Sequence, residues 1–553
     1  MDTSSATIQD HLREVIDDKI KVSNQVAQEL KYRHNSLAPI SRLPHETLAE
    51  IFSLLSFPAD EYECVPYMKW ICVTHVCHRW REIALCFPYL WNHIDFTGLT
   101  LTGVTKILAR AKMSPLKFEA HGITPSSKAR FKAFGRHLEA HISHTRHLSI
   151  SGNCRTVLRR LVSPAPALVS LALTKSPYSY PCIIPDSLFN GTAPMLRCLN
   201  LTGYCIGSKS PLLKGLQSLE IWIRPTQATP TFRDWLDALN EMSQLTTLVL
   251  GHVSPAVSVD NLLISEPQRT VTLPSLTHFN IGASANDCAL ALAHLVLPAV
   301  ISLRVTLQSQ SRDGDDVRPL IPYVARNAHG PQDTAPLQTI LLNEDPTLVE
   351  VVAWTIPDAN VEVYDSDTLR KAAASARLVL SVRPDIGWDD RMETVIFDAM
   401  LSHLPLGAIS TLAAHNYTRL SKEVWLSHAP RLTMLNQLLL VSTAVRAFGE
   451  MLEEDALPNG LPRLPQLTKL ILFLFEVPLT KRMTYHLRDI LVKRMEHGTP
   501  LETLNLRTCI GPQHAIQLLM ETVESCKVGH STFSDWEGRV GPFDEEEERI
   551  DDD

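Results

Sequence analysis

One six-residue phrase constrains the fold of this 553-residue chain more than any other feature. The phrase has the form L-x-x-L-x-L, and successive copies begin 20 to 37 residues apart, with one gap of 98 residues between 337 and 435. Its alternation predicts a short strand at every copy, with the leucines on one face. The copies are TRHLSI (145–150), LVSLAL (168–173), LRCLNL (196–201), LQSLEI (216–221), LTTLVL (245–250), LTHFNI (276–281), VISLRV (300–305), LQTILL (337–342), LNQLLL (435–440), LTKLIL (467–472) and LETLNL (501–506).

The segments between the copies predict helices, as in TFRDWLDALNEMSQ (231–244) and HLRDILVKRMEHG (486–498). One strand–helix repeat cannot bury its own apolar faces, whereas stacked repeats share a continuous core. The sequence therefore predicts an irregular leucine-rich-repeat-like solenoid, with a parallel sheet on its concave face and helices outside. In the gap, YDSDTLRKAAASARLVLSV (364–382) and AISTLAAHN (408–416) are candidate degenerate repeats. Before the gap, polar residues 306–335 predict a loop or insertion on the array.

Residues 38–96 form a second distinctive stretch, rich in apolar residues at helical spacing. Leu48, Ile51, Phe52 and Leu55 follow the i, i+3, i+4, i+7 pattern of one helix face. Pro44 stands at the predicted first turn, Pro58 at the predicted end, and a polar insert, 57–69, follows. A second helical block is expected from Trp70 to Phe87. A bundle of roughly 50 residues is close to the lower size limit of a stable core, so its surplus of apolar side chains suggests a partner surface.

The stretches LPHETLAEIFSLL, VTHVCHRWREIA and PYLWNHIDF resemble an F-box, in the form common in mushroom-forming fungi. The opening Leu-Pro, the V-C-x-x-W of the last helix and the trailing Leu90–Trp91 carry the resemblance, and the long insert departs from it. The resemblance implies docking on a Skp-family adaptor and, through it, a cullin. The residues that we expect to bind the adaptor are Leu43, Pro44, Leu48, Ile51, Phe52, Val76, Cys77 and Trp80.

The resemblance also implies a function: the substrate-recognition subunit of an SCF-type cullin–RING ubiquitin ligase. The concave face would bind an unknown protein substrate through the variable positions of the phrase, such as Arg197, Cys198 and Asn200. The alternative is a non-catalytic repeat scaffold, in which the bundle only caps the solenoid. In that case the Leu48/Ile51/Phe52 face would pack against residues near Ile107, Leu108 and Phe118.

The expected domain order is an amphipathic helix in 1–37, the F-box bundle in 38–96, the solenoid in 97–525 and an acidic extension in 526–553. In the first of these, apolar residues recur at helical steps between Ile8 and Leu30. The pattern is shorter than three clean heptads, so two interpretations stay open: a helix packed on its own protein, or a weak dimerisation helix. The last ten residues carry eight acids and one arginine, which accounts for most of the net charge of −8.

Composition and motifs argue against several classes of protein. The rest of the chain is nearly neutral, which disfavours a nucleic-acid binder. The first residues lack an apolar signal region, and no apolar run is long enough to cross a bilayer. The 11 cysteines form no CxxC pair and are scattered through apolar runs, as in a reduced cytoplasmic or nuclear protein.

No cofactor, metal or catalytic site is predicted, because phosphate-cradle, nucleophile-elbow and zincin motifs are absent. The Cys72, His75, Cys77 and His78 group spreads around a helix and cannot converge on one ion. Among four clustered histidines, His137, His141 and His144 lie at i, i+4 and i+7 and are expected on a solvated helix face, whereas His147 belongs to the strand phrase that follows. We therefore expect a protein that is not an enzyme.

Overall fold

In the computed structural model, most of residues 3–528 have a described placement. The gaps are 56–68, 123–127, 224–225, 227–228, 231, 252–269, 299–300, 310–314, 329–334, 346, 358–371, 385–391, 417–419, 442–443, 446, 449–450, 452–462, 474–480, 508–516, 518, 520, 522 and 524. The chain divides into two compact units, which are described separately: residues 1–176 with 182–212, and residues 177–181 with 213–553.

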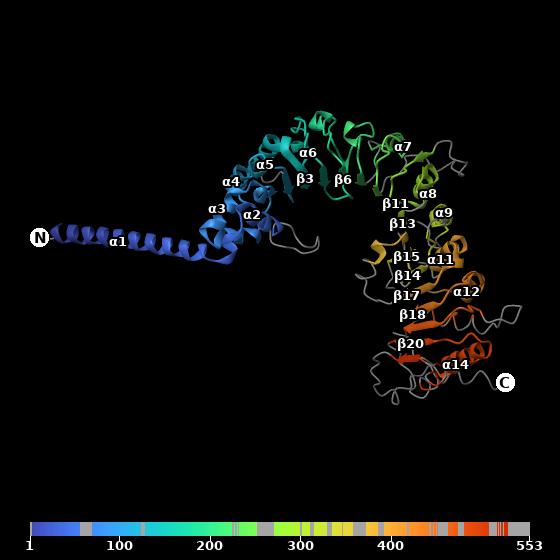
Figure 1. Ribbon diagram of the computed structural model, residues 1–553. Coiled ribbons are helices and arrows are strands. Elements are labelled where there is room, and N and C mark those ends of the chain that lie inside the picture. Colours follow the sequence, from blue (N-terminus) through green and yellow to red (C-terminus); the bar gives the residue numbers. More distant parts are fainter. Residues whose placement is uncertain are drawn as a thin grey trace. The chain divides into compact units, whose positions relative to one another are not determined.

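The first unit begins with helices and continues as a parallel sheet (Figure 1). Its helices are α1 (Thr3–Ser36), α2 (His45–Leu54), α3 (His78–Cys86), α4 (Leu101–Ala111), α5 (Lys128–His141) and α6 (Arg155–Leu158), with 3-10 turns η1 (Pro39–Arg42), η2 (Lys69–His75) and η3 (Pro88–Trp91) among them. Its main strands are β1 (His93–Asp95), β2 (Leu116–Ala120), β3 (Thr145–Ser151), β4 (Ser170–Thr174) and β6 (Cys198–Thr202), paired in that order and all parallel. Because β1 lies within residues 38–96, the predicted bundle itself supplies the first strand of the sheet.

The second unit continues the strand–helix pattern. Its helices include α7 (Phe232–Asn240), α8 (Ala285–His294), α9 (Ile321–Ala328), α11 (Met392–His403), α12 (Lys422–His428) and α14 (Lys481–Glu496). Across the sheet the strands are β8 (Ser218–Trp222), β9 (Thr247–Gly251), β11 (His278–Ala283), β13 (Ser302–Ser309), β16 (Leu378–Pro384), β15 (Leu348–Trp354), β14 (Thr339–Asp345), β17 (Thr411–Asn416), β18 (Gln437–Val441), β19 (Lys469–Phe473), β20 (Thr503–Arg507) and β21 (Ser525–Val528).

The sheet of the second unit is mixed, so the prediction of a wholly parallel sheet is wrong. Strand β15 runs antiparallel to both of its neighbours, β14 and β16. Asp345 pairs with Leu348 at the end of the β14–β15 hairpin, and such a short connection permits only antiparallel strands. As a result β13 pairs with β16 rather than with β14, the next strand of the repeated phrase.

Every copy of the phrase contributes a strand, and its leucines lie in the core. In the phrase 245–250, for example, Leu245, Leu248 and Leu250 are all buried. The 98-residue gap in the phrase contains β15, β16 and β17, so strands continue through it. The predicted loop at 306–335 is wrong in part, because β13 extends to Ser309 and α9 lies within the segment.

The helical bundle differs from its predicted form at two points. Pro44 precedes α2 as its N-cap residue instead of occupying the first turn. The block expected as one helix, Trp70 to Phe87, is broken at Cys77, whose extended backbone (φ −156°) separates η2 from α3. Pro58 and all of the insert 57–69 except Lys69 lie outside the described residues.

A buried arginine, Arg494, holds one turn of the array. Arg494 of α14 is 4% exposed and donates to the main-chain carbonyls of Arg463, Leu464 and Leu467, at 2.9, 3.0 and 3.1 Å. Leu464 has a left-handed backbone (φ 54°), so the guanidinium stabilises a turn that leucine disfavours. Burial lowers the pKa of Arg494 to about 10, and the side chain stays charged at neutral pH.

Candidate functional site

The apolar residues of α2 divide between the interior and the surface. Leu48 and Phe52 are buried, whereas Ile51 and Leu54 on the same helix are 39% and 72% exposed. Leu48 and Phe52, both predicted to bind an adaptor, therefore form the core of the bundle and are not available at its surface. The apolar residues of α2 extend around more of the helix than the part that α3 and η3 cover, so some of them stay exposed.

The packing inside the bundle explains the Leu-Pro and V-C-x-x-W patterns. The ring of Trp80, half-buried on α3, packs on Phe52 with centroids 5.0 Å apart. Next to Trp80, Arg79 donates to the carbonyl oxygen of Leu43 at 2.6 Å and also to that of Ser41. Arg79 therefore holds the segment that starts α2 against α3, a role that the sequence patterns did not reveal.

The exposed apolar residues around this bundle come from α2, from η2 and from the turn before α3. Of the predicted adaptor-binding residues, Pro44, Ile51 and Val76 are exposed, whereas Leu43, Cys77 and Trp80 are half-buried. The prediction omitted exposed apolar neighbours, which are Ile40, Leu54, Leu55 and Ile71. Leu54 and Leu55 could have been found from the sequence, because they continue the apolar content of α2 beyond its buried stripe.

Trp91 joins the bundle to the sheet that follows. Its indole nitrogen donates to the carbonyl of Ala84 in α3 at 2.8 Å, and its ring meets Trp70 edge-on at 4.9 Å. The guanidinium of Arg110 in α4 lies 4.3 Å from the centre of the same ring. The bundle is thus packed onto the start of the array through Trp91, while Phe118 packs on Phe134.

The face of the sheet opposite the buried leucines changes character within the second unit. In β8, β9 and β13 the side chains on this face are half-exposed, as Glu220, Val249 and Arg304 illustrate. In β14–β19 the central positions of this face are buried: Val352, Leu439 and Ile471 are all fully covered or nearly so. We call the first part the open face and the second the sealed face.

A short segment, residues 372–376, packs against the sealed face. Ala373 and Ala376 join a cluster with Leu341, Val352, Trp354, Val379, Ala413, Leu439, Val441, Ile471 and Phe473. The indole of Trp354 donates to the carbonyl of Ala372 at 3.0 Å, and Ser302 Oγ donates to that of Ala376 at 2.8 Å. Arg304 also donates to Ala373. The segment is thus fixed by both packing and hydrogen bonds, and it leaves β8–β13 as the open face of this unit.

The open face has a flat aromatic side chain at its centre. Trp222 of β8 lies over Gly251 and Gly282, the residues beside it on β9 and β11. A Cβ atom placed on Gly251 would lie 1.9 Å from Trp222 Cε3, so no other residue fits there with the indole in this position. Two residues earlier on the same strand stands Glu220, whose pKa is raised by burial.

The positions predicted for substrate recognition lie at β6 in the first unit. Cys198 is exposed and Asn200 is half-buried, so both are at the surface of the sheet. Arg197 is half-buried, precedes the strand and donates to the carbonyls of Pro194 and Leu196, which ties its guanidinium to its own turn. Elsewhere in this unit, Glu119 accepts hydrogen bonds from His93 and Lys117, which lower its pKa to about 2.

Of the three histidines expected on a solvated helix face, His144 does not lie at the surface. His144 is buried, and its ring meets that of His141 edge-on at 5.2 Å. Neither ring nitrogen of His144 has a hydrogen-bond partner. The expectation is wrong for His144 because the residue lies in the turn η4 (Ile142–His144), which packs on α5. Among the described residues, no group of three or more His, Cys, Asp or Glu side chains could hold a metal ion.

This arrangement predicts a pH dependence of stability. Burial lowers the pKa of His144, and it also lowers the pKa values of His137, His141 and His147. The four histidines therefore bind a proton at a higher pH in the unfolded chain than in the folded one. Their contribution to the free energy of unfolding is complete above pH ~6.5 and is lost as the pH falls below that value. Urea unfolding of the first unit, followed at pH 7.5 and 5.5, should show the loss.

His144→Phe should raise the stability by about 1–2 kcal/mol, because it removes two buried nitrogens without partners. It should also reduce the difference between pH 7.5 and 5.5. The exposed His121 provides the control, since His121→Phe should leave that difference unchanged. A pH-independent stability of the natural chain would contradict the assignment.

Residues 40–97 match the family model described as F-box-like, so the N-terminal bundle is F-box-like. No curated protein matches the chain. A solved structure titled "Crystal structure of TLR13-ssRNA13 complex" is similar at 14% identity with a TM-score of 0.36; the match covers 80% of this chain and 55% of that one. This chain therefore spans little more than half the length of that structure. Among the described helices, none is both long and apolar enough to cross a membrane.

Proposed function

We propose that this protein is the substrate-recognition subunit of an SCF-type ubiquitin ligase and is not itself an enzyme. The F-box-like bundle would dock on a Skp-family adaptor and through it on a cullin. The observation that carries the proposal is the division of α2, which has a complete core of Leu48 and Phe52 and still presents Ile51 and Leu54 outward. Exposed aliphatic side chains beside a closed core are typical of a protein interface.

The array would hold a protein substrate in a leucine-rich-repeat-like manner. On the second unit we assign this role to the open face of β8–β13, where Trp222 offers a large, rigid contact surface. The sealed face has a structural role instead, because residues 372–376 already cover part of it. The chemistry is proximity: the bound substrate's lysines are kept near activated ubiquitin at high effective concentration. Such a receptor would work in the cytoplasm or nucleus.

A double substitution on the outward face of α2 tests the docking. Ile51→Asp with Leu54→Asp should weaken capture of a purified Skp-family adaptor by about 30- to 700-fold, because two apolar anchors of an interface carry about 2–4 kcal/mol. Isothermal titration calorimetry with the full chain measures the effect. The core is untouched, so circular dichroism and the thermal midpoint should stay unchanged.

Met113→Asp is the matched control, because Met113 is equally exposed (72%) but lies after α4, outside the bundle. It should bind the adaptor like the natural chain. If the natural chain does not bind the adaptor, the alternative gains support: a repeat scaffold in which the bundle only caps the array. The contacts of Trp91 with Ala84 and Arg110 support this alternative, because they join the bundle to α4.

A further inference from the structure

Helix α1 carries a long apolar stripe that nothing in the described chain covers. Residues 10–36 are all exposed. Seven large aliphatic side chains among them are 42% to 61% exposed, namely Leu12, Val15, Ile16, Ile20, Val22, Val26 and Leu30. Only the end of the helix meets the bundle, where Tyr32 contacts His78 edge-on. An isolated helix gains little stability in water from its own hydrogen bonds, so such a stripe indicates a packing partner.

The spacing of the stripe is that of a helix pair. Leu12, Ile16, Lys19, Ser23, Val26 and Leu30 follow one another at steps of 4, 3, 4, 3 and 4 residues. This is the alternation of the two core positions of a coiled coil. The seam from Leu12 to Leu30 is about 27 Å long at 1.5 Å per residue. It has two apolar residues at each end and two polar residues, Lys19 and Ser23, in the middle.

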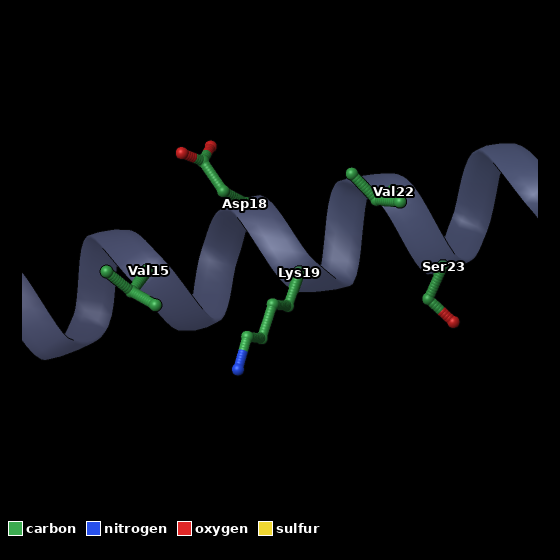
Figure 2. Close-up of a pocket in the computed structure, with 5 residues that line it drawn as sticks. All are labelled: Val15, Asp18, Lys19, Val22 and Ser23. Carbon is green, nitrogen blue, oxygen red and sulfur yellow. The ribbon is translucent and has the colours of Figure 1, made fainter.

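An open hollow on α1 adjoins the middle of this seam. Val15, Asp18, Lys19, Val22 and Ser23 border it (Figure 2). Of these residues only Lys19 and Ser23 belong to the seam, so the hollow lies along its edge.

The sequence of α1 matches itself when a second copy runs in the opposite direction. About a centre at Lys21, Leu12 faces Leu30 and Ile16 faces Val26, so apolar residues meet at both ends. Lys19 then faces Ser23, whereas in a parallel pair two copies of Lys19 would face each other at a core position. Residues 10–18 hold four acids and one arginine, while residues 19–34 hold four bases and one glutamate. About this centre residues 10–18 face residues 24–32, which hold one lysine and one glutamate. The antiparallel arrangement therefore keeps the two acidic segments apart, and it sets the opposite helix dipoles side by side.

We infer that α1 is a homodimerisation helix, and that two copies of this chain pair through it in antiparallel orientation. The acidic half of the helix disfavours the other common use of such a stripe, which is insertion into an anionic lipid surface. The inference is independent of the proposed function, because the stripe lies on α1 and the outward face for adaptor docking lies on α2.

Sedimentation velocity of the full chain tests the pairing. Between about 1 and about 100 µM the natural chain should shift from monomer towards dimer. Ile16→Glu with Val26→Glu should raise the dissociation constant at least about 100-fold, since two charges would enter the seam. Gln25→Glu with Gln28→Glu is the matched control, because it adds the same charge on the outer side of the helix and should leave the dimer intact. A natural chain that stays monomeric at all concentrations would overturn the inference.

Cysteine cross-linking tests the orientation. Leu12→Cys alone should add no oxidative cross-link to those of the natural chain, because two copies of residue 12 lie at opposite ends of an antiparallel seam. Leu12→Cys with Leu30→Cys should form a covalent dimer through facing positions. Cross-linking of the single variant would show a parallel pair and would contradict the antiparallel arrangement.

Discussion

Phe52→Ala is expected to unfold the F-box-like bundle and to abolish adaptor capture together with it. Phe52 is 1% exposed, and its ring packs on Trp80 at 5.0 Å. Removing such a ring costs about 3–5 kcal/mol, through lost burial and the cavity that remains. A bundle of this size has little stability in reserve, so a loss of this magnitude exceeds what its remaining packing can offset.

Hydrogen exchange read by mass spectrometry is the measurement for this variant. Peptides from α2 and α3 should lose protection, while peptides from the strands of the second unit should keep it, because repeats are stabilised mainly by their neighbours. Leu54→Ala is the control: it lies on the same helix but is 72% exposed, so protection should be unchanged even where adaptor binding weakens. Full protection of α2 in the Phe52 variant would show that Phe52 is not part of the core of the bundle.

Trp354→Ala is expected to expose the sealed face of the second unit. Trp354 is 1% exposed, belongs to the cluster of Leu341 and Val352, and donates to the carbonyl of Ala372. The substitution removes the indole and one of the hydrogen bonds that fix residues 372–376, at a cost of about 4–5 kcal/mol. The aliphatic side chains of β14 and β17–β19 on the sealed face would then become accessible to solvent.

Binding of a hydrophobic dye should report this exposure, and the urea midpoint of the second unit should fall. Ile356→Ala serves as the control, because Ile356 follows the same strand but is 52% exposed. It should bind no additional dye. Unchanged dye binding and an unchanged midpoint in the Trp354 variant would mean that the indole does not hold the segment in place.

Much of the fold was predictable because each copy of the phrase carries its own signal. The alternation of leucines needs no distant information, and all the copies formed strands with buried leucines, as in β9 and β18. The order of the strands in the sheet was harder to predict from the sequence. LVLSV at 378–382 pairs with β13 because β14 and β15 form a hairpin, and no local pattern shows which edge a strand will join.

The candidate site shows the same limit at the level of single residues. Ile51 and Phe52 are adjacent and both apolar, and only the packing of α3 decides that Phe52 points inward. Arg79 and Arg304 could not be singled out at all, because their partners are main-chain carbonyls of distant segments. Such contacts depend on the path of the folded main chain, so the type of the residue does not reveal them.

The sequence by itself determined that the chain begins with amphipathic helices, contains an F-box-like stretch and continues as repeated strands, because these features follow from local periodicity and from a motif of fixed spacing. Only the tertiary structure decided which apolar residues of α2 stay at the surface, that β15 reverses direction, and that residues 372–376 seal part of the sheet. The physical reason is that burial is a property of neighbours brought together by the fold. A residue's own apolar character says that it will be covered, but not whether its own chain or another molecule covers it.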